Sequence, residues 1–315
     1  MSKGYCEKSE LTAIADAIRS KSGKTDTLTL AQMPTEIESL STGGGEEYGT
    51  VTFNGKVSSP LTINSLIEKI TFSSDFDTSS VTSMSKLFYG MSKITSLDLS
   101  MFDTSSVTDM QYIFSGMEKI TSLDLSMFNT SSVTGDTYNG GFLYMFNNCK
   151  SLTSIKFGDK WDTSKVVNMG GMFCNCQSLT SLDLSMFNTS SVTGDTYSGA
   201  FSQMFYSCGN LTSLNLSSFN TQNARNMYSM FYGCSSLRNL TIGTDWGINT
   251  SVTELNLSYC PSLSHDSCLD VFNKLADKTQ TATTSARLYL NISTKALMSD
   301  EEIKIATDKG WTISY

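Results

Sequence analysis

The chain repeats itself at a near-constant interval, and this constrains its fold more than any other feature. The text ITSLDLSMF occurs at 94–102 and again at 120–128, and a close copy starts at Leu179. Successive residues Phe76, Phe102 and Phe128 lie 26 positions apart. A period of roughly 20–29 residues is typical of leucine-rich repeats, whose units stack because no unit can bury its own apolar face.

Each unit divides into a strand and a second apolar segment. Leu97 and Leu99 alternate with polar residues, which predicts a strand with one buried face. An aromatic residue follows, and then an Asp or Asn whose short side chain can bond backbone groups in a turn. The next apolar residues, as in 84–91, are spaced i, i+3, i+4 and i+7. This spacing favours one face of a short helix.

We therefore predict an α/β fold built on a leucine-rich-repeat solenoid over residues 73–262. A parallel β-sheet is expected along one side and short helices along the other. The aromatic residues at the equivalent position of each unit are expected to form one buried column. These residues are Phe102, Phe128, Trp161, Phe187, Phe219 and Trp246.

The segment before the repeats is different in kind. Residues 1–40 have helical apolar spacing and predict a small helical N-terminal module. The Gly- and Glu-rich stretch at 41–49 predicts a linker. Residues 50–72 are expected to form β-strands that cap the first coil.

The segment after the repeats, 263–315, predicts an α/β C-terminal cap. A helix is expected after Ser264, a strand around Leu288, and a second helix that begins with a capping box of Ser299 and Glu302. A different terminal unit is expected because the last coil of an open stack would otherwise expose its core and its strand edge.

The unit consensus, F-[DN]-T-S-x-V-x-x-M-x-x-M-F-x-x-C-x-x-L-T-S-L, resembles the BspA-like leucine-rich repeat family of bacterial surface proteins over roughly 70–260. The resemblance implies a non-enzymatic repeat surface that takes part in adhesion. The stretch LTAIADAIRSKSGKTDTLTLAQMPTEIESL, at 11–40, is similar to a module at the start of tail and structural proteins of phages that infect gut bacteria.

Composition excludes several classes of function. The formal charge of −8 and the lack of clustered Lys and Arg argue against nucleic-acid binding. No apolar run approaches the length of about 18 residues that a membrane span requires, so no membrane insertion is expected. Residues 1–10 lack the basic and apolar regions of a signal peptide, and ordinary Sec export is therefore not expected.

Catalysis and metal binding are not expected either. The chain has one histidine, His265, and no Gly-rich phosphate loop, so we predict neither an enzyme nor a cofactor. Repeated cysteines occupy a position that Met fills in earlier units, which indicates buried packing and not a metal site. Oxidation between cysteines of neighbouring coils stays open, because their spacing falls within disulfide reach. The repeat-position cysteines are Cys149, Cys176, Cys208 and Cys234.

Two six-residue insertions, GDTYNG at 135–140 and GDTYSG at 194–199, are the sharpest local signal for binding. Insertions in repeat proteins form loops on one edge, and Tyr among Gly, Ser and Asn is typical of contact surfaces. The alternative is that both were copied when a two-coil block was duplicated. The predicted contact residues are Asp136, Thr137, Tyr138, Asp195, Thr196 and Tyr197.

A second candidate is the exposed column of the strand face. It would form a sugar- or cation-binding strip or, in the simpler interpretation, a solvated surface. Its residues are Asp98, Asp124, Lys156, Asp183, Asn215 and Thr241.

Two functional hypotheses follow. The first is a phage virion protein of the tail, in which residues 1–40 dock to other virion proteins and the repeats contact a glycan or protein of the host surface. The alternative is a BspA-like adhesin of the bacterial cell surface that lacks its leader. The expected location is accordingly the virion or the extracellular cell surface.

Overall fold

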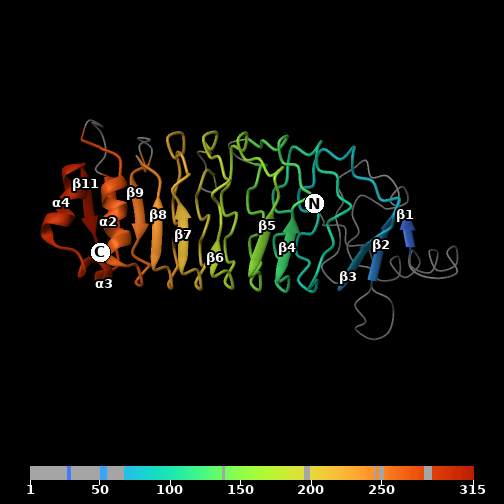
Figure 1. Ribbon diagram of the computed structural model, residues 1–315, viewed down its shortest axis with the longest axis horizontal. Helices are drawn as coiled ribbons and strands as arrows, with labels where there is room; N and C mark the ends of the chain where they lie inside the picture. Colours follow the sequence, from blue (N-terminus) through green and yellow to red (C-terminus); the bar gives the residue numbers. More distant parts are fainter. Residues whose placement is uncertain are drawn as a thin grey trace, which may run out of the picture.

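The computed structural model is an elongated stack of coils that runs from β1 at one end to α4 and β11 at the other (Figure 1). It describes residues 27–29, 50–54, 67–136, 139–194, 199–244, 246–247, 252–279 and 286–315. Within these residues no helix combines the length and apolar character that crossing a bilayer requires.

Every pair of neighbouring strands is parallel. The first sheet holds β1 (Thr27–Thr29), β2 (Thr50–Asn54) and β3 (Lys69–Phe72). The next two sheets hold β4 (Ser122–Leu125) with β5 (Ser154–Phe157), and β6 (Ser181–Leu182) with β7 (Ser213–Leu216) and β8 (Asn239–Ile242). The last holds β9 (Glu254–Leu257), β10 (Ala286–Leu290) and β11 (Trp311–Ser314).

The side of the coils that carries β4 to β8 is called here the strand wall, over 96–100, 122–126, 154–158, 181–185, 213–217 and 239–243. Its inward residues alternate as expected, and Leu123 and Leu125 are buried. The expected single sheet is nevertheless wrong, because the ladder is interrupted between β5 and β6 and residues 96–100 form no strand. The register of the coils is fixed instead by hydrogen bonds elsewhere in each unit.

The second apolar segment of each unit is not a helix, which corrects the prediction of short helices. The six segments form runs of turns and are called here the turn wall: 84–91, 110–117, 142–149, 169–176, 201–208 and 227–234. The residues at i, i+3, i+4 and i+7 are buried as predicted, and Met84 and Met91 mark the ends of one such set. A helix and a four-residue turn repeat bury the same positions. The spacing of the apolar residues therefore could not distinguish the two backbones.

The backbone of the turn wall follows a four-residue period. The third and seventh residues of each segment have positive φ, as at Lys86 (φ 61°) and Gly90 (φ 72°). Gly or Asn occupies the seventh position in five of the six segments, Ser207 being the other. These residue types tolerate left-handed backbone best, and they signal a break in any helix.

Hydrogen bonds between coils are continuous along the turn wall. In the first five segments, the residues at the first, third, fifth and seventh positions donate to the next coil, as from Met84, Lys86 and Phe88 to the carbonyls 25 residues ahead. The same pattern connects all six segments. The N–H groups at the fourth, sixth and eighth positions close turns within the segment, as from Leu87 to the Met84 carbonyl at 3.2 Å. The second-position N–H donates to a residue just before the segment, as from Gln111 to the Asp109 carboxylate at 3.0 Å. Both sets of backbone donors are therefore satisfied without an α-helix.

The predicted aromatic column is buried but not continuous. Phe187 stacks on Phe219 at 6.4 Å, whereas Phe128 has its ring contact with Phe114 of the turn wall, at 6.3 Å. The continuous column lies in the turn wall itself, where the ladder holds equivalent rings at one spacing. Its members are Phe88, Phe114, Phe146, Phe173, Phe205 and Phe231, with centroids 5.5 to 6.0 Å apart and interplanar angles of 4° to 10°.

The Asx-Thr pair after each strand fixes the corner of the coil. The Asp103 carboxylate accepts a hydrogen bond from the Ser105 N–H at 2.9 Å, which confirms the expected turn. The buried Thr104 hydroxyl donates to the Asn129 carbonyl at 2.9 Å and accepts from the Asn129 N–H at 2.8 Å. Four other threonines make the same pair of hydrogen bonds to the next coil: Thr78, Thr130, Thr163 and Thr189.

The helices and the strand expected within 263–315 are present. Helix α2 (His265–Lys274) begins at Ser264 and packs beside β8, where the Ser267 hydroxyl accepts from the Leu240 N–H at 3.0 Å. A short helix, α3 (Ile292–Lys295), follows β10, so Ile292 belongs to a helix and not to the strand expected around it. Helix α4 (Asp300–Asp308) begins with the predicted capping box.

The helices expected in residues 1–40 lie outside the described residues. Within that segment the structure describes Thr27–Thr29, which form β1 and pair with β2. The strands expected at 50–72 are present as β2 and β3.

Candidate interaction surfaces

The two insertions leave the coil through narrow necks. A Cβ atom on Gly135 would lie 2.5 Å from the Gly141 backbone N, and one on Gly140 would lie 2.8 Å from the Gly135 Cα. Gly194 is equally confined, since its Cβ would lie 2.1 Å from the Ala200 N. The glycines that frame each insertion are therefore required for the loop to leave and re-enter the wall at nearly one point.

Asp136 stabilises the base of the first insertion. Its carboxylate accepts the Asn139 N–H at 2.6 Å, and its own N–H donates to the Asn139 carbonyl at 2.8 Å. The other predicted contact residues lie outside the described residues, so their mutual placement stays a prediction. They are Thr137, Tyr138, Asp195, Thr196 and Tyr197.

The strand-face column is exposed, as expected from its alternation. Asp98, Asp124, Lys156, Asp183 and Asn215 are all exposed, and Thr241 is half-buried. The registers Asp124↔Lys156 and Asn215↔Thr241 place these pairs side by side on adjacent strands.

The carboxylates of this column already have local partners. Asp98 and Asp183 accept the N–H of the residue two positions on, and these hydrogen bonds lower the pKa of both groups. The pKa of Asp124 falls to about 2 because of the Ser126 hydroxyl and N–H and the Lys156 amine, 3.1 Å away. The column is thus a series of Asx turns with one ion pair between coils. Across the described residues no three His, Cys, Asp or Glu side chains form a metal-binding group.

The repeat-position cysteines are buried, as predicted. Each thiol donates to a Phe carbonyl of the preceding coil, as from Cys149 to Phe114 at 3.1 Å, and Cys260 continues the series. Burial raises the pKa of Cys149 to about 12. These thiols fill the space that Met91 and Met117 fill in the first two coils. The described cysteines are free.

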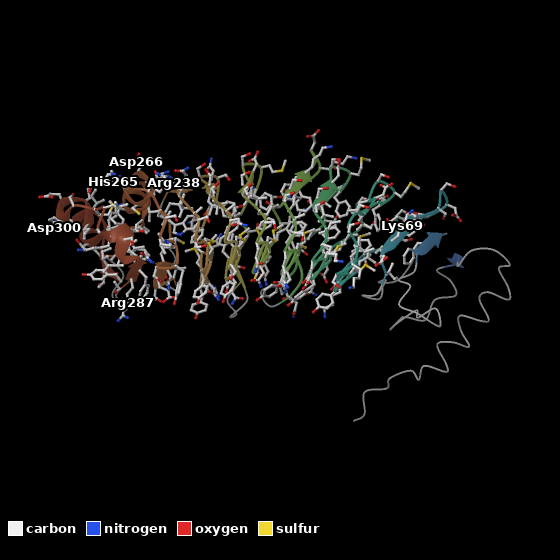
Figure 2. All side chains as sticks on the ribbon, turned by 90° about the horizontal axis from the view of Figure 1, so that it is seen from below. Lys69, Arg238, His265, Asp266, Arg287 and Asp300 are labelled. Atoms are coloured by element: carbon white, nitrogen blue, oxygen red, sulfur yellow. The ribbon has the colours of Figure 1, made fainter. Side chains whose placement is uncertain are left out.

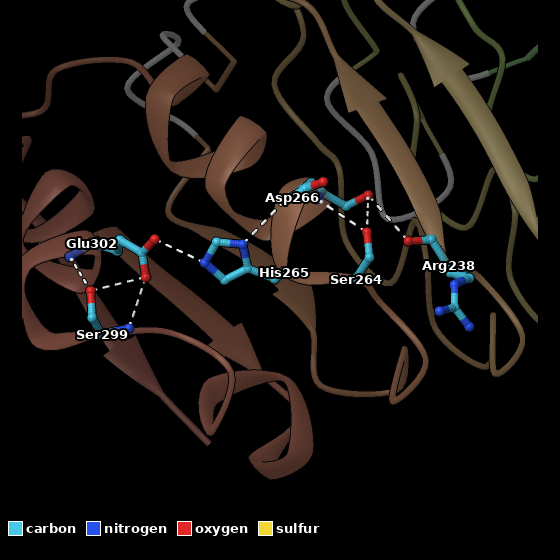
Figure 3. A network of polar contacts seen from close by, with 7 residues as sticks. Arg238, Ser264, His265, Asp266, Ser299 and Glu302 are labelled. Carbon is cyan, nitrogen blue, oxygen red and sulfur yellow. Dashed lines mark hydrogen bonds and ion pairs between the residues drawn. The ribbon is translucent and has the colours of Figure 1, made fainter.

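His265 takes part in a polar network at the C-terminal end of the stack, with Asp266 and Arg238 nearby (Figure 2). Its Nε2 lies 2.8 Å from the Glu302 carboxylate and its Nδ1 lies 3.2 Å from Asp266 (Figure 3). The hydrogen bonds to Asp266 and Glu302 raise the pKa of the imidazole. The Nε2 contact connects α2 to Glu302 of the α4 capping box, whereas Asp266 is the next residue on α2 itself, so the residue has a structural role.

A hollow of about 400 Å³ lies at the corner of the coil after β7. Hydroxyl and amide side chains form most of its lining, and Phe219 and Thr221 belong to the buried corner already described. The lining residues are Ser217, Ser218, Phe219, Asn220, Thr221, Gln222 and Thr244.

A row of tyrosines on the turn wall was missed from the sequence. Tyr112 stacks on Tyr144 with ring centroids 5.3 Å apart, and Tyr89 contacts Tyr112 edge-on at 6.1 Å. The Tyr144 ring lies over Gly171, where a Cβ would come within 2.1 Å of it, and its hydroxyl donates to the Gln203 side chain at 2.7 Å. The helix interpretation concealed this row, because only the four-residue period shows which positions face outward.

The second row begins farther along the same wall and continues beyond its last segment to Tyr259. Tyr206 stacks on Tyr232 at 4.8 Å, and Tyr232 contacts Tyr259 at 3.9 Å. Tyr228, nearby on the same segment as Tyr232, is 44% exposed. The two rows give the turn wall an aromatic surface that spans coils on both sides of the insertions.

The repeats match the model of a protein family described as Mycoplasma protein of unknown function, DUF285, over residues 61–152 and 140–261. The chain belongs to this DUF285 family. The match is consistent with the resemblance of the repeats to BspA-like surface proteins. It does not extend to residues 1–40, and it gives the phage-tail interpretation no support. Comparison with curated proteins and with solved structures returned no match.

Proposed function

We propose that this chain is a recognition protein of the bacterial cell surface, a leucine-rich-repeat solenoid of the BspA type that binds without catalysis. The observation that supports it most is the DUF285 match over the stacked coils, whose buried apolar residues form one core. This places the alternative of the sequence analysis, the cell-surface adhesin, ahead of the virion protein. A surface location outside the cell is part of the same proposal.

The chemistry of the described residues supports a binding role. His265 is engaged through both ring nitrogens with carboxylates of the cap, and it donates to no candidate nucleophile. Burial raises the pKa of described thiols such as Cys149 and Cys174. These thiols are therefore poor nucleophiles at neutral pH. Recognition therefore needs the shape and surface of the coils and not a reacting group.

The insertions are the proposed contact loops. They leave the wall and re-enter it at glycines where a Cβ atom would clash with the backbone, as at Gly135 and Gly194. We expect the double variant Tyr138→Ala, Tyr197→Ala to retain the melting temperature and to bind target cells more weakly. The partner is a glycan or protein of the host-cell surface.

The experiment is a cell-binding titration with the purified full chain, labelled at a fixed site and read by flow cytometry. Tyr315→Ala is the matched control, because Tyr315 is 70% exposed and lies at the chain's far end. Saturable binding of the wild type and the control supports the proposal. Failure of the wild type to bind any host cell or bacterial neighbour would overturn it.

A further inference from the structure

We propose that the turn wall binds an uncharged polysaccharide that lies along the stack of coils. This inference rests on the proposed recognition function and names its ligand class. It concerns the residues of the turn wall and not those of the insertions, and three properties of that wall carry it: charge, side-chain chemistry and repeat geometry.

The turn wall is nearly free of charge although the chain has a formal charge of −8. Lys86 is the one charged residue in its six segments. The strand wall, in contrast, carries Asp98, Asp124, Lys156 and Asp183. A polyanion needs several cations and a polycation several carboxylates, and this wall supplies neither. The near absence of charge on the turn wall therefore favours a neutral ligand.

The exposed and half-buried side chains of the wall suit sugar hydroxyls. Amide groups both donate and accept hydrogen bonds, as hydroxyls do, and a tyrosine adds a phenol and a flat apolar ring. The large hydrophobic side chains that are exposed on the six segments are all tyrosines, Tyr89 and Tyr228. Aliphatic anchors of the kind that fill pockets in protein partners are absent from these described segments. The amide residues are Gln111, Asn147, Asn148, Asn175 and Gln203.

The geometry suits a chain of repeating units. Equivalent residues of successive coils are hydrogen-bonded neighbours, so six coils span five steps of roughly 4.8 Å, about 24 Å in all. The tyrosine rows are fixed before any ligand binds, since Tyr144 is held between Tyr112, Gly171 and the Gln203 amide. Side chains that are already ordered lose little entropy on binding, which favours a weakly interacting polymer.

The test is affinity electrophoresis of the full chain in gels that contain a neutral β-glucan, α-mannan or dextran, with alginate as the charged comparison. Two double variants probe the rows: Tyr112→Ser with Tyr144→Ser, and Tyr232→Ser with Tyr259→Ser. Tyr315→Ser is the matched control, because Tyr315 is exposed but lies outside the wall. Circular dichroism melting of each variant verifies that the fold is retained.

We expect at least one neutral polysaccharide to retard the wild type and the control, and each double variant to lose about tenfold in affinity. Retardation by alginate alone, no retardation by any of the neutral polymers, or equal retardation of all variants would overturn the inference. In the second arm, target cells are treated with periodate or with protease before the cell-binding titration.

The second arm separates the inference from the proposed function. Binding that periodate abolishes and protease spares supports the polysaccharide. Binding that protease abolishes and periodate spares identifies a protein partner, which overturns the inference and leaves the recognition function standing. If the untreated cells are not bound at all, the proposed function fails, and the gel result then decides the inference alone.

Discussion

The strand wall and the turn wall of the same coils are held together differently. The strand wall has regular strands but interrupted sheets, and its exposed Asp residues bond their own turns. The turn wall has no regular element over its six segments, yet its hydrogen bonds between coils continue without a break from 84 to 234. The turn wall, although it contains no helix or strand, therefore sets the register of the stack.

The two walls also differ in which residues pack inside and which face outward. On the turn wall, the fifth residue of each segment builds the stacked Phe column inside, and the third and sixth positions supply the tyrosine rows outside. On the strand wall, the inward residues are mainly aliphatic and pair in register, as Leu123 with Ile155 and Leu214 with Leu240, and several outward residues are charged. A neutral outer face behind a rigid inner column is what a binding surface requires. The following predictions test this contrast.

The largest expected effect is the loss of a ring from the turn-wall column. Phe173→Ala should cost about 3–5 kcal/mol of unfolding free energy, as expected for a fully buried ring. Phe128→Ala removes an equally buried ring that contacts one neighbour, Phe114, where Phe173 contacts two. It should cost less by about 0.5–1.5 kcal/mol, the contribution of one aromatic pair. Urea denaturation of both variants measures the difference, and a larger loss for Phe128→Ala would contradict the contrast.

The corner hydroxyls should have the next largest effect. Thr130→Val leaves the Asp162 N–H and carbonyl without their partner in a fully buried site. Each unsatisfied buried group costs about 1–3 kcal/mol. Thr130→Ser keeps the hydroxyl and should recover most of that loss. Equal stability of the Val and Ser variants in urea would show that the hydroxyl bonds do not hold the corner.

Left-handed backbone should make one glycine of the turn wall irreplaceable. Gly116 has φ +82°, and a Cβ there would lie 3.0 Å from the Gly90 Cα of the preceding coil. Gly116→Ala should cost about 1–2 kcal/mol from the conformation alone, and more if the coils must separate. Gly209 is the matched control, since its Cβ would meet nothing nearer than 3.7 Å. Thermal melting should show a clear loss for Gly116→Ala and almost none for Gly209→Ala.

The sequence predicted best the regions where the residue pattern fits only one backbone conformation. Alternating Leu residues indicated the strands at 122–125 and 213–216, although the same alternation at 96–100 forms no strand. Ser264 and the Ser299 capping box indicated the cap helices. The turn wall was missed because the i, i+3, i+4, i+7 spacing fits two backbones. The Gly and Asn at the seventh positions, as at Gly90 and Asn148, distinguish them, since a helix interior would not place them there in nearly every unit.

The tyrosine rows could not be predicted for the same reason. Which side chains face outward depends on the four-residue period, and contacts such as Tyr144 with Gln203 cross 59 positions of sequence. The insertions were visible directly, because a departure from a repeat needs no knowledge of its backbone. The structure explains why glycines frame the insertions, because at Gly135 and Gly194 any other residue would clash with the backbone. It does not identify the ligand.

The smallest expected effect concerns a contact within the cap, where a charge and not a hydrogen-bond ladder connects α2 to α4. His265 donates from both nitrogens to Asp266 and Glu302 only when its ring is protonated. The hydrogen bonds to these two carboxylates raise its pKa in the folded state. A raised folded pKa means that the stabilisation is complete below the unfolded value of about 6.5 and is lost as pH rises through the folded pKa.

We therefore expect the melting temperature of the wild type to fall slightly as pH rises from about 6 to about 8, and the fall to be absent in His265→Gln. Glu302→Gln is the sharper variant, because Gln keeps the capping bonds of α4 but removes the charge. In that variant the His265 ring, followed by NMR titration, should titrate at lower pH than in the wild type. The contact is partly exposed, with 40% of the imidazole accessible, so screening by salt should weaken the effect. An unchanged ring titration in Glu302→Gln would show that Glu302 does not hold the charge, and that this ion pair does not help to hold α2 against α4.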